Sequence, residues 1–328
     1  MNRRKIVVAS TVAMFAVAGV VAGLTLYTSF VVRAAIGDLP AAVQYFPADS
    51  QAIVGINVRA FINSPFYAKF EAEHGQKIGS ELTEFIEKTG VDPRRDLDYV
   101  VAGGRSLGGG KGSGALIAIG RFNRDAITTF INSRTVPITV DYNGAKVYMI
   151  PEKSGGELEK GIAFLRDGEI GLGDLESLKA ILDVSAGKPG ITANETLAPL
   201  LGQLDPRAMF WFAGDAADLL ARSPIQSPIG EKIASIQSVF GTLNLTDAVS
   251  GRITANARDE ESATKLADVV KGFIALGQLA SEQNAELAEL MKGIGVVQDK
   301  HQIHLSVNFS ADILERLEQM KTRARRVL

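Results

Sequence analysis

The chain has 328 residues, of which 46% are hydrophobic and none is cysteine. This composition excludes a mainly disordered chain, a disulfide framework, a thiol nucleophile and cysteine-ligated metal sites. Four of the 35 Lys and Arg precede the first acidic residue, Asp38, which leaves 31 basic against 37 acidic groups in the rest of the chain. That acidic surplus argues against nucleic-acid binding, so we expect no nucleic-acid partner.

The first 33 residues are predicted to form a cytoplasmic tail and a transmembrane anchor. Residues 6–32 carry no charge and exceed the roughly 20 apolar residues that a spanning helix needs. Three basic residues precede this stretch and only Arg33 follows it, so the positive-inside rule places the N-terminus in the cytoplasm and the rest of the chain outside. We therefore expect a single-pass protein of the cytoplasmic membrane that contacts the bilayer through residues 6–32, with cleavage near Arg33 as the alternative.

The predicted anchor also has a face of small residues. At about 100° per residue, one side of the helix collects five positions: Ala9, Ala13, Ala16, Gly19 and Gly23. Gly19 and Gly23 form a G-x-x-x-G pair, and small residues let two helices approach closely in lipid. The face predicts packing of this helix against itself or against a larger membrane complex; ordinary membrane-helix composition is the alternative.

Residues 34–203 are predicted to form a first α+β module. The strands expected from apolar runs and hairpin signals are 51–58, 99–102, 115–119, 140–142, 145–150, 162–165 and 169–172. The expected helices lie near 65–70, 76–89, 123–131 and 174–186. Asn143-Gly144 and Asp167-Gly168 predict tight hairpins, whereas Gly90 and Gly187 predict helix ends.

Residues 204–328 are predicted to form a second α+β module. Its expected strands are 209–212, 247–255, 295–297 and 302–307, of which the last two form a hairpin. Its expected helices lie near 216–221, 230–240 and 311–326, with a longer helix that begins at Asp259.

Similar segments recur in the two modules. Pro47–Pro65 and Pro206–Pro224 match without gaps at a constant offset of 159 residues, each with an apolar strand, a short helix and a Ser-Pro pair. The hairpin that begins at Gly161 resembles the one at Gly293, and residues 98–103 more weakly resemble residues 247–251. The sequence therefore predicts an α+β fold, in which an N-terminal transmembrane helix precedes two related modules of mainly antiparallel sheet with helices covering one face.

Three motifs in the N-terminal third are FPADSQAIVGINV at 46–58, SPF at 64–66 and TGVDPRRDLDYVVAGG at 89–104. In these motifs the chain resembles a group of uncharacterised bacterial single-pass envelope proteins with duplicated domains of unknown function. The resemblance implies an extracytoplasmic location. It implies no established catalytic residues.

The Gly-rich segment Gly103–Gly114 is the best candidate for a phosphate-binding loop. It departs from the P-loop pattern G-x-x-x-x-G-K-[ST], because Arg105 replaces the first glycine and Gly112 replaces the hydroxyl residue. Both flanks are predicted strands, so no helix N-terminus faces the loop. We expect a hairpin loop, with weak contact to an anion or a polysaccharide through Arg105 and Lys111 as the alternative.

The histidines and carboxylates form no catalytic pattern. His301 and His304 are predicted to lie in one strand on opposite faces, so a shared metal is not expected. The turn Asp92–Asp96 is the densest charged segment and predicts local ion pairs. No catalytic, cofactor-binding or metal-binding residue is therefore predicted, and no cofactor is expected.

Together these features predict a non-enzymatic, membrane-anchored extracytoplasmic protein. We expect it to bind a protein partner, to associate with itself or to scaffold an envelope complex. A module that binds an envelope glycan or lipid is the first alternative. The second is an unrecognised hydrolase whose carboxylates meet only in space.

Overall fold

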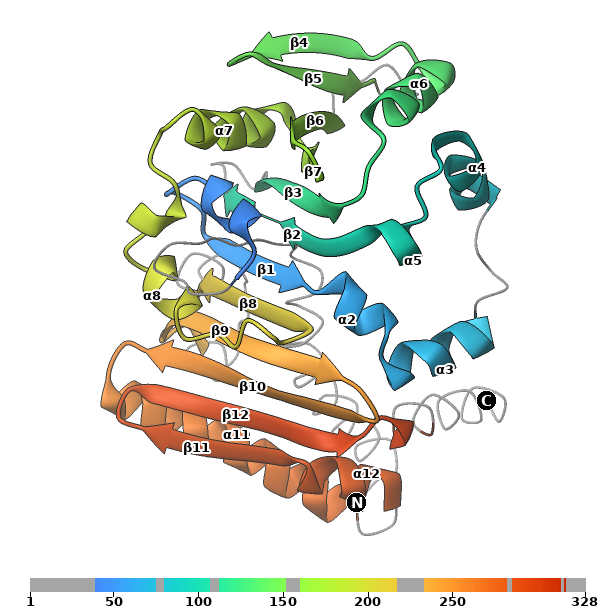
Figure 1. Cartoon of the computed structure of the whole chain (residues 1–328). Helices are drawn as coiled ribbons and strands as arrows, with labels where there is room; N and C mark the ends of the chain where they lie inside the picture. The colour runs from blue at the N-terminus through green and yellow to red at the C-terminus, as the bar shows by residue number, and fades with distance from the viewer. Residues whose placement is uncertain are drawn as a thin grey trace. The chain divides into compact units, whose positions relative to one another are not determined.

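A computed structural model describes residues 39–74, 80–106, 112–151, 160–216, 233–281, 285–313 and Arg316 (Figure 1). The predicted anchor, its small-residue face and Lys111 lie outside these residues. Within the part that is described, no helix is both long and apolar enough to cross a membrane. The chain divides into two compact units after Gly214, whereas the sequence placed the boundary after residue 203. The difference arises because the strand that includes residues 210–214 pairs within the first unit.

The first unit contains a sheet in which every described pairing is antiparallel. Its strands are β1 (Ala52–Ile56), β2 (Leu97–Ser106), β3 (Gly112–Gly120), β4 (Ile138–Tyr142), β5 (Ala145–Ile150), β6 (Lys160–Arg166), β7 (Glu169–Gly173) and β8 (Phe210–Asp215). Their spatial order is β8-β1-β2-β3-β7-β6-β5-β4. Asn143 and Gly144 form the tight β4–β5 turn with φ of 48° and 77°, as the Asn-Gly pair predicts.

The first unit contains α-helices and short 3-10 helices, several of which begin at a side chain that accepts a hydrogen bond from the backbone. They are η1 (Ala41–Tyr45), α2 (Val58–Ile62), α3 (Pro65–His74), α4 (Ser80–Thr89), α5 (Pro93–Asp96), α6 (Arg124–Arg134), α7 (Leu175–Ser185), η4 (Ile191–Ala193) and α8 (Leu197–Leu201). Asn57, Asn123 and Asp174 cap α2, α6 and α7 in this way.

Helices cover both faces of the first unit's sheet, which corrects the prediction of one covered face. Ile127 and Ile131 of α6 pack with Phe164 of β6 in one buried cluster. Leu178 of α7 lies against Gly161 on the opposite face of the same strand. The strand accepts a helix on each side because apolar residues alternate with small ones along it.

The described residues of the second unit include four antiparallel strands with helices against them. The strands are β9 (Ile236–Leu245), β10 (Ala248–Ala257), β11 (Ile294–Asp299) and β12 (Gln302–Ser310), in the spatial order β11-β12-β10-β9. The helices are α11 (Glu260–Ala280), capped by Asp259, and α12 (Ala285–Lys292). Leu266 of α11 packs with Ile303, and Met291 of α12 packs with Ile294.

Two local predictions in the second unit are wrong. Residues 230–240 were expected to form a helix, but β9 begins at Ile236. β-branched and aromatic residues favour a strand there, and β10 forms nine residue pairs with it. His301 was expected in a strand, but it lies in the β11–β12 turn, and only His304 lies in β12.

The two units repeat one strand order. In the first unit, the hairpin β2–β3, the helix α6 and the hairpin β6–β7 give the spatial order β2-β3-β7-β6. In the second, the hairpin β9–β10, the helix α11 and the hairpin β11–β12 give β9-β10-β12-β11. This repeat supports the predicted duplication and makes β4–β5 an addition to the first unit. It also corrects the weakest sequence match, because residues 98–103 lie in β2, which corresponds to β9 and not to β10.

Candidate functional site

Helix α3 carries aromatic side chains but adds nothing to the core of the first unit. Ser64 starts the helix, because its hydroxyl accepts a hydrogen bond from the Tyr67 N–H (3.1 Å) and Pro65 follows at a position that needs no donor. None of the described side chains of α3 is buried. The aromatic side chains of this helix are therefore partly exposed to solvent.

The aromatic residues of α2, α3 and β8 form one contiguous cluster. It comprises Phe61, Phe66, Tyr67, Phe70 and Phe210. Phe61 lies at its centre, with ring centroids 5.4 Å from those of Tyr67 and Phe210 in edge-to-face geometry. The ring centroid of Phe70 lies 6.4 Å from that of Tyr67, and Phe70 is 51% exposed. A large, partly exposed ring in such a cluster is a candidate apolar contact point.

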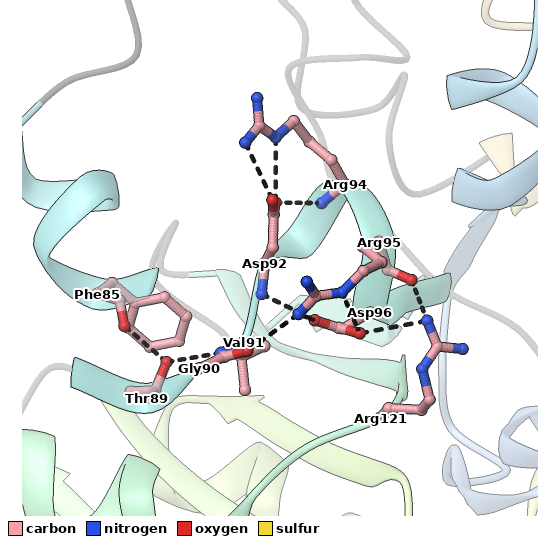
Figure 2. Close-up of polar contacts among 9 residues, drawn as sticks. All are labelled: Phe85, Thr89, Gly90, Val91, Asp92, Arg94, Arg95, Asp96 and Arg121. Atoms are coloured by element: carbon pink, nitrogen blue, oxygen red, sulfur yellow. Dashed lines mark hydrogen bonds and ion pairs between the residues drawn. The ribbon is translucent and has the colours of Figure 1, made fainter. Parts of the chain in front are cut away.

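An ion-pair network lies at α5, in the charged turn Asp92–Asp96 (Figure 2). Asp96 accepts hydrogen bonds from both sides, from Arg95 Nη2 (2.7 Å) and from Arg121 Nη2 (3.2 Å). Its Oδ2 also accepts from the Asp92 N–H (2.9 Å), and Arg121 donates to the Arg95 carbonyl. The predicted local ion pairs are thus confirmed, with Arg121 as a partner from a distant part of the sequence.

In this network the Asp96 carboxylate is buried, whereas the guanidinium groups that bind it are exposed. The Asp96 side chain is 9% exposed, whereas those of Arg95 and Arg121 are 67% and 56% exposed. Hydrogen bonds from Arg95 are the main cause that lowers the pKa of Asp96 to about 2, and they outweigh the effect of burial. Asp96 is therefore a poor acid or base near neutral pH, and the network presents arginine donors to the solvent.

Arg94 connects the network to the aromatic cluster. Its guanidinium binds Asp92 through Nη2 (2.9 Å) and lies 3.7 Å from the Glu71 carboxylate of α3. Burial and the nearby Glu71 carboxylate raise the pKa of Tyr67, so its hydroxyl stays protonated. We name this region the aromatic–arginine surface, and it consists of Phe66, Tyr67, Phe70 and Arg94.

The Gly-rich hairpin places Arg105 in an ion pair instead of an open anion site. Arg105 Nη1 donates to Asp49 Oδ2 (2.8 Å). The cavity beside it, lined also by Phe46 and Ser177, has about 10 Å³ of free volume, close to what one water molecule needs. The described residues therefore bring Arg105 to no ligand-sized pocket, and its suggested companion Lys111 lies outside them.

Asp174 ties this hairpin to α7. It accepts hydrogen bonds from the N–H groups of Ser177 (2.8 Å) and Gly114 (2.8 Å), and from the Ser113 hydroxyl (3.1 Å). Burial raises the pKa of Asp174, but the hydrogen bonds outweigh it and hold the pKa below its usual value. The cluster has two serines and a carboxylate but no histidine in the contacts described, so it joins two elements and does not form a catalytic triad.

The described residues hold no group of three or more potential metal ligands. His304 Nδ1 lies 2.9 Å from the Thr254 hydroxyl across neighbouring strands. A polar surface groove of about 240 Å³ lies between η1 and the end of α7, lined by Gln44, Tyr45, Val184, Ser185, Lys188, Gly190 and Thr192. Its volume is just below the usual range for small-molecule sites.

No family model and no curated protein matches the chain. The solved structures that are similar to it include crystal forms I and IV of the protein TP0453. The first has 6% identity and a TM-score of 0.42, and the match covers 84% of this chain and 96% of that one. The second has 10% identity and a TM-score of 0.41, over 82% and 92% of the two chains. These values assign neither a family nor a function.

The aromatic–arginine surface was not predicted as a site, although its residues were visible in the sequence. Phe66 and Phe70 are four residues apart, and Tyr67 adjoins Phe66, so all three lie near one side of a helix. The sequence signal for an exposed aromatic group was that the other residues of this short helix are polar or small. Its proximity to Arg94, by contrast, follows only from the folded chain.

Proposed function

We propose that this chain is a membrane-anchored extracytoplasmic protein that binds a protein partner through the aromatic–arginine surface, without catalysis. The observation that carries the proposal is the ordered aromatic cluster, with the partly exposed ring of Phe70 and the partly exposed guanidinium of Arg94 beside it. Aromatic residues and arginine dominate the energetic centres of protein interfaces. The membrane anchor in this proposal rests on the sequence of residues 6–32 alone.

Site-specific photo-cross-linking in cells tests the partner. A photoreactive phenylalanine analogue at Phe70 is expected to give an adduct with one discrete protein. The matched position is Val136, which is 85% exposed and lies outside this surface. The same adduct from both positions, or none from Phe70, would contradict the proposal.

A variant pair then tests the surface itself. Phe70→Ser removes the exposed ring, and it is expected to reduce partner recovery at least tenfold, which corresponds to about 1.4 kcal/mol. Arg207→Glu, at an 88% exposed side chain outside the surface, is the control and is expected to leave recovery unchanged. Equal recovery of the partner with Phe70→Ser and with the unmodified chain would exclude this surface as the binding site.

The topology of the proposal has its own test. Protease added to intact spheroplasts is expected to digest the chain beyond about residue 35, because the positive-inside rule exports that part. Protection of the C-terminal region would reverse the orientation and remove the basis for an extracytoplasmic partner.

The polar groove between η1 and α7 favours a second function, binding of an envelope glycan. Tyr45 and the polar side chains of Gln44, Lys188 and Thr192 line it. Aromatic rings with amide, hydroxyl and ammonium groups supply stacking and hydrogen bonds suited to sugars. Soluble envelope glycan fragments that shift the amide signals of Tyr45 and Thr192, with no shift at Phe70, would favour this function over the first.

A further inference from the structure

The outer edge of β11 in the second unit has no neighbouring strand among the described residues. Its counterpart in the first unit, β6, is covered at the same edge by β5, which pairs with it in antiparallel register. The internal repeat therefore shows how a strand can cover this edge in the first unit, whereas the same edge of β11 is uncovered in the second.

The correspondence between β6 and β11 extends to single residues. Each is the first strand of the second hairpin in the repeated strand order, β6–β7 or β11–β12, and each has a Gly-Ile pair at or near its start. Ile162 of β6 packs in the cluster beneath α6, and Ile294 of β11 packs with Met291 of α12. In the first unit, Ile162 lies directly opposite Tyr148 of β5. The equivalent position opposite Ile294 is empty of any described strand.

The backbone of β11 offers hydrogen-bond groups along this edge. Asp299 and Gln302 flank a two-residue turn and therefore form a backbone hydrogen-bonded pair. Since hydrogen-bonded and non-hydrogen-bonded pairs alternate, the N–H and C=O groups of the odd-numbered residues of β11 bond to β12. The Gly293 carbonyl, which accepts from the Asn308 N–H (2.7 Å), continues the same alternation. The N–H and C=O groups of Ile294, Val296 and Gln298 therefore point away from β12.

The end strand β4 of the first unit has features that discourage strand addition, and β11 lacks them. Pro137 precedes β4 and removes one donor, and Asp141 forms an exposed ion pair with Lys146 (2.9 Å). β11 has no proline and no charge before its last residue, Asp299, while Val297 is 63% exposed. An apolar edge without such protection is a template for another strand.

We propose that β11 pairs in antiparallel fashion with β11 of a second copy of this chain, which joins the two sheets across a twofold axis. The geometry favours this occupant because a twofold axis gives the antiparallel orientation that β5 has on β6. With Val296 on the axis, Val297 faces Gly295 of the other copy, so a large side chain meets a small one at both symmetric positions. Asp299 then faces Gly293, and no like charges oppose each other within the strand.

Cysteine cross-linking of the full chain in mild detergent tests this interface, because the chain has no native cysteine. Val297→Cys is expected to give a covalent dimer with a short bis-maleimide. Val136→Cys, on a residue that is 85% exposed near β4, is the control and should react without forming a dimer. Adding Val296→Pro should abolish the Val297→Cys dimer, because it removes an outward donor while sparing the bonds to β12. Thr139→Pro makes the same change on β4 and should leave the dimer intact.

Val297→Lys gives a second test that does not depend on how well the proline variant folds. Its side chain is exposed in one copy, but two lysines would be diagonal neighbours across the axis, so we expect loss of the dimer in light scattering. The proposal is overturned if Val297→Cys reacts with a monofunctional maleimide but yields no dimer. It is also overturned if the cysteine of Val297→Cys does not react with maleimide although the chain is a monomer. Cross-linking that persists after Val296→Pro is added would overturn it as well.

Discussion

The indole N–H of Trp211 on β8 donates a hydrogen bond to the hydroxyl of Tyr99 on β2, although β1 lies between the two strands. Gly55 of β1 is the register partner of Trp211, and the indole lies over it. Trp211 is fully buried, and burial raises the pKa of Tyr99 far above its ordinary value. Because Gly55 has no side chain, the Trp211 indole can extend over β1 from β8 to β2 and so connect the three strands.

This relationship predicts that Gly55→Ala strongly destabilises the first unit. An added Cβ would overlap the Trp211 ring, and the closely packed core leaves the indole no alternative place, so we expect a loss of about 1–3 kcal/mol or more. Trp211 is the only tryptophan, so urea titration followed by its fluorescence reports on this unit. Gly272→Ala is the control and should stabilise α11 by about 0.5–1 kcal/mol in circular dichroism, because a Cβ there meets nothing within 4 Å. Equal unfolding midpoints for Gly55→Ala and the unmodified chain would contradict the packing described here.

The contrast between Gly55 and the hairpins shows what the sequence can predict. Asn143-Gly144 and the capping residue Asp174 act on their immediate neighbours, so their turn and helix were predictable. The antiparallel α+β class and most strands followed from such local signals. By contrast, the contact of Trp211 with Tyr99 depends on strand order, which no local pattern encodes. The same limit explains β9, where pairing with β10 decided between a helix and a strand.

The contacts of the candidate site also divide into those that the sequence predicts and those that depend on the fold. Ion pairs inside the turn Asp92–Asp96 were predictable from adjacent opposite charges. The contribution of Arg121 and the contact between Arg94 and Glu71 were not, because they join residues from separate elements. The aromatic cluster falls between these cases, since its α3 members share a helix side while Phe210 comes from a remote strand.

Asp174→Ala is expected to cost more than the loss of a helix cap. Removing an N-cap carboxylate typically costs about 0.5–2 kcal/mol, and Asp174 also accepts from Gly114 N–H and the Ser113 hydroxyl of β3. Asp259→Ala is the matched variant, because Asp259 caps α11 through the Ser262 N–H (2.7 Å) at an exposed position. Thermal unfolding should show the larger destabilisation for Asp174→Ala. A difference of zero would mean that the bonds to β3 add nothing to stability.

Asp96→Asn is expected to change both the stability and its dependence on pH. The substitution weakens hydrogen bonds from Arg95 and Arg121 to a buried carboxylate, so we expect a loss of about 1–3 kcal/mol near pH 7. Because folding lowers the pKa of Asp96 from 3.8 to about 2, its contribution is present above about pH 4 and is lost as the pH falls toward 2. The free energy of unfolding should therefore fall less steeply over this range in Asp96→Asn than in the unmodified chain.

Asp205→Asn is the control, since Asp205 is also paired with an arginine, Arg207, but is 48% exposed, and exposed pairs contribute little. Urea titrations at half-unit pH steps measure these slopes, and a slope in Asp96→Asn equal to that of the unmodified chain would show that the carboxylate of Asp96 is not held by its two arginines in solution.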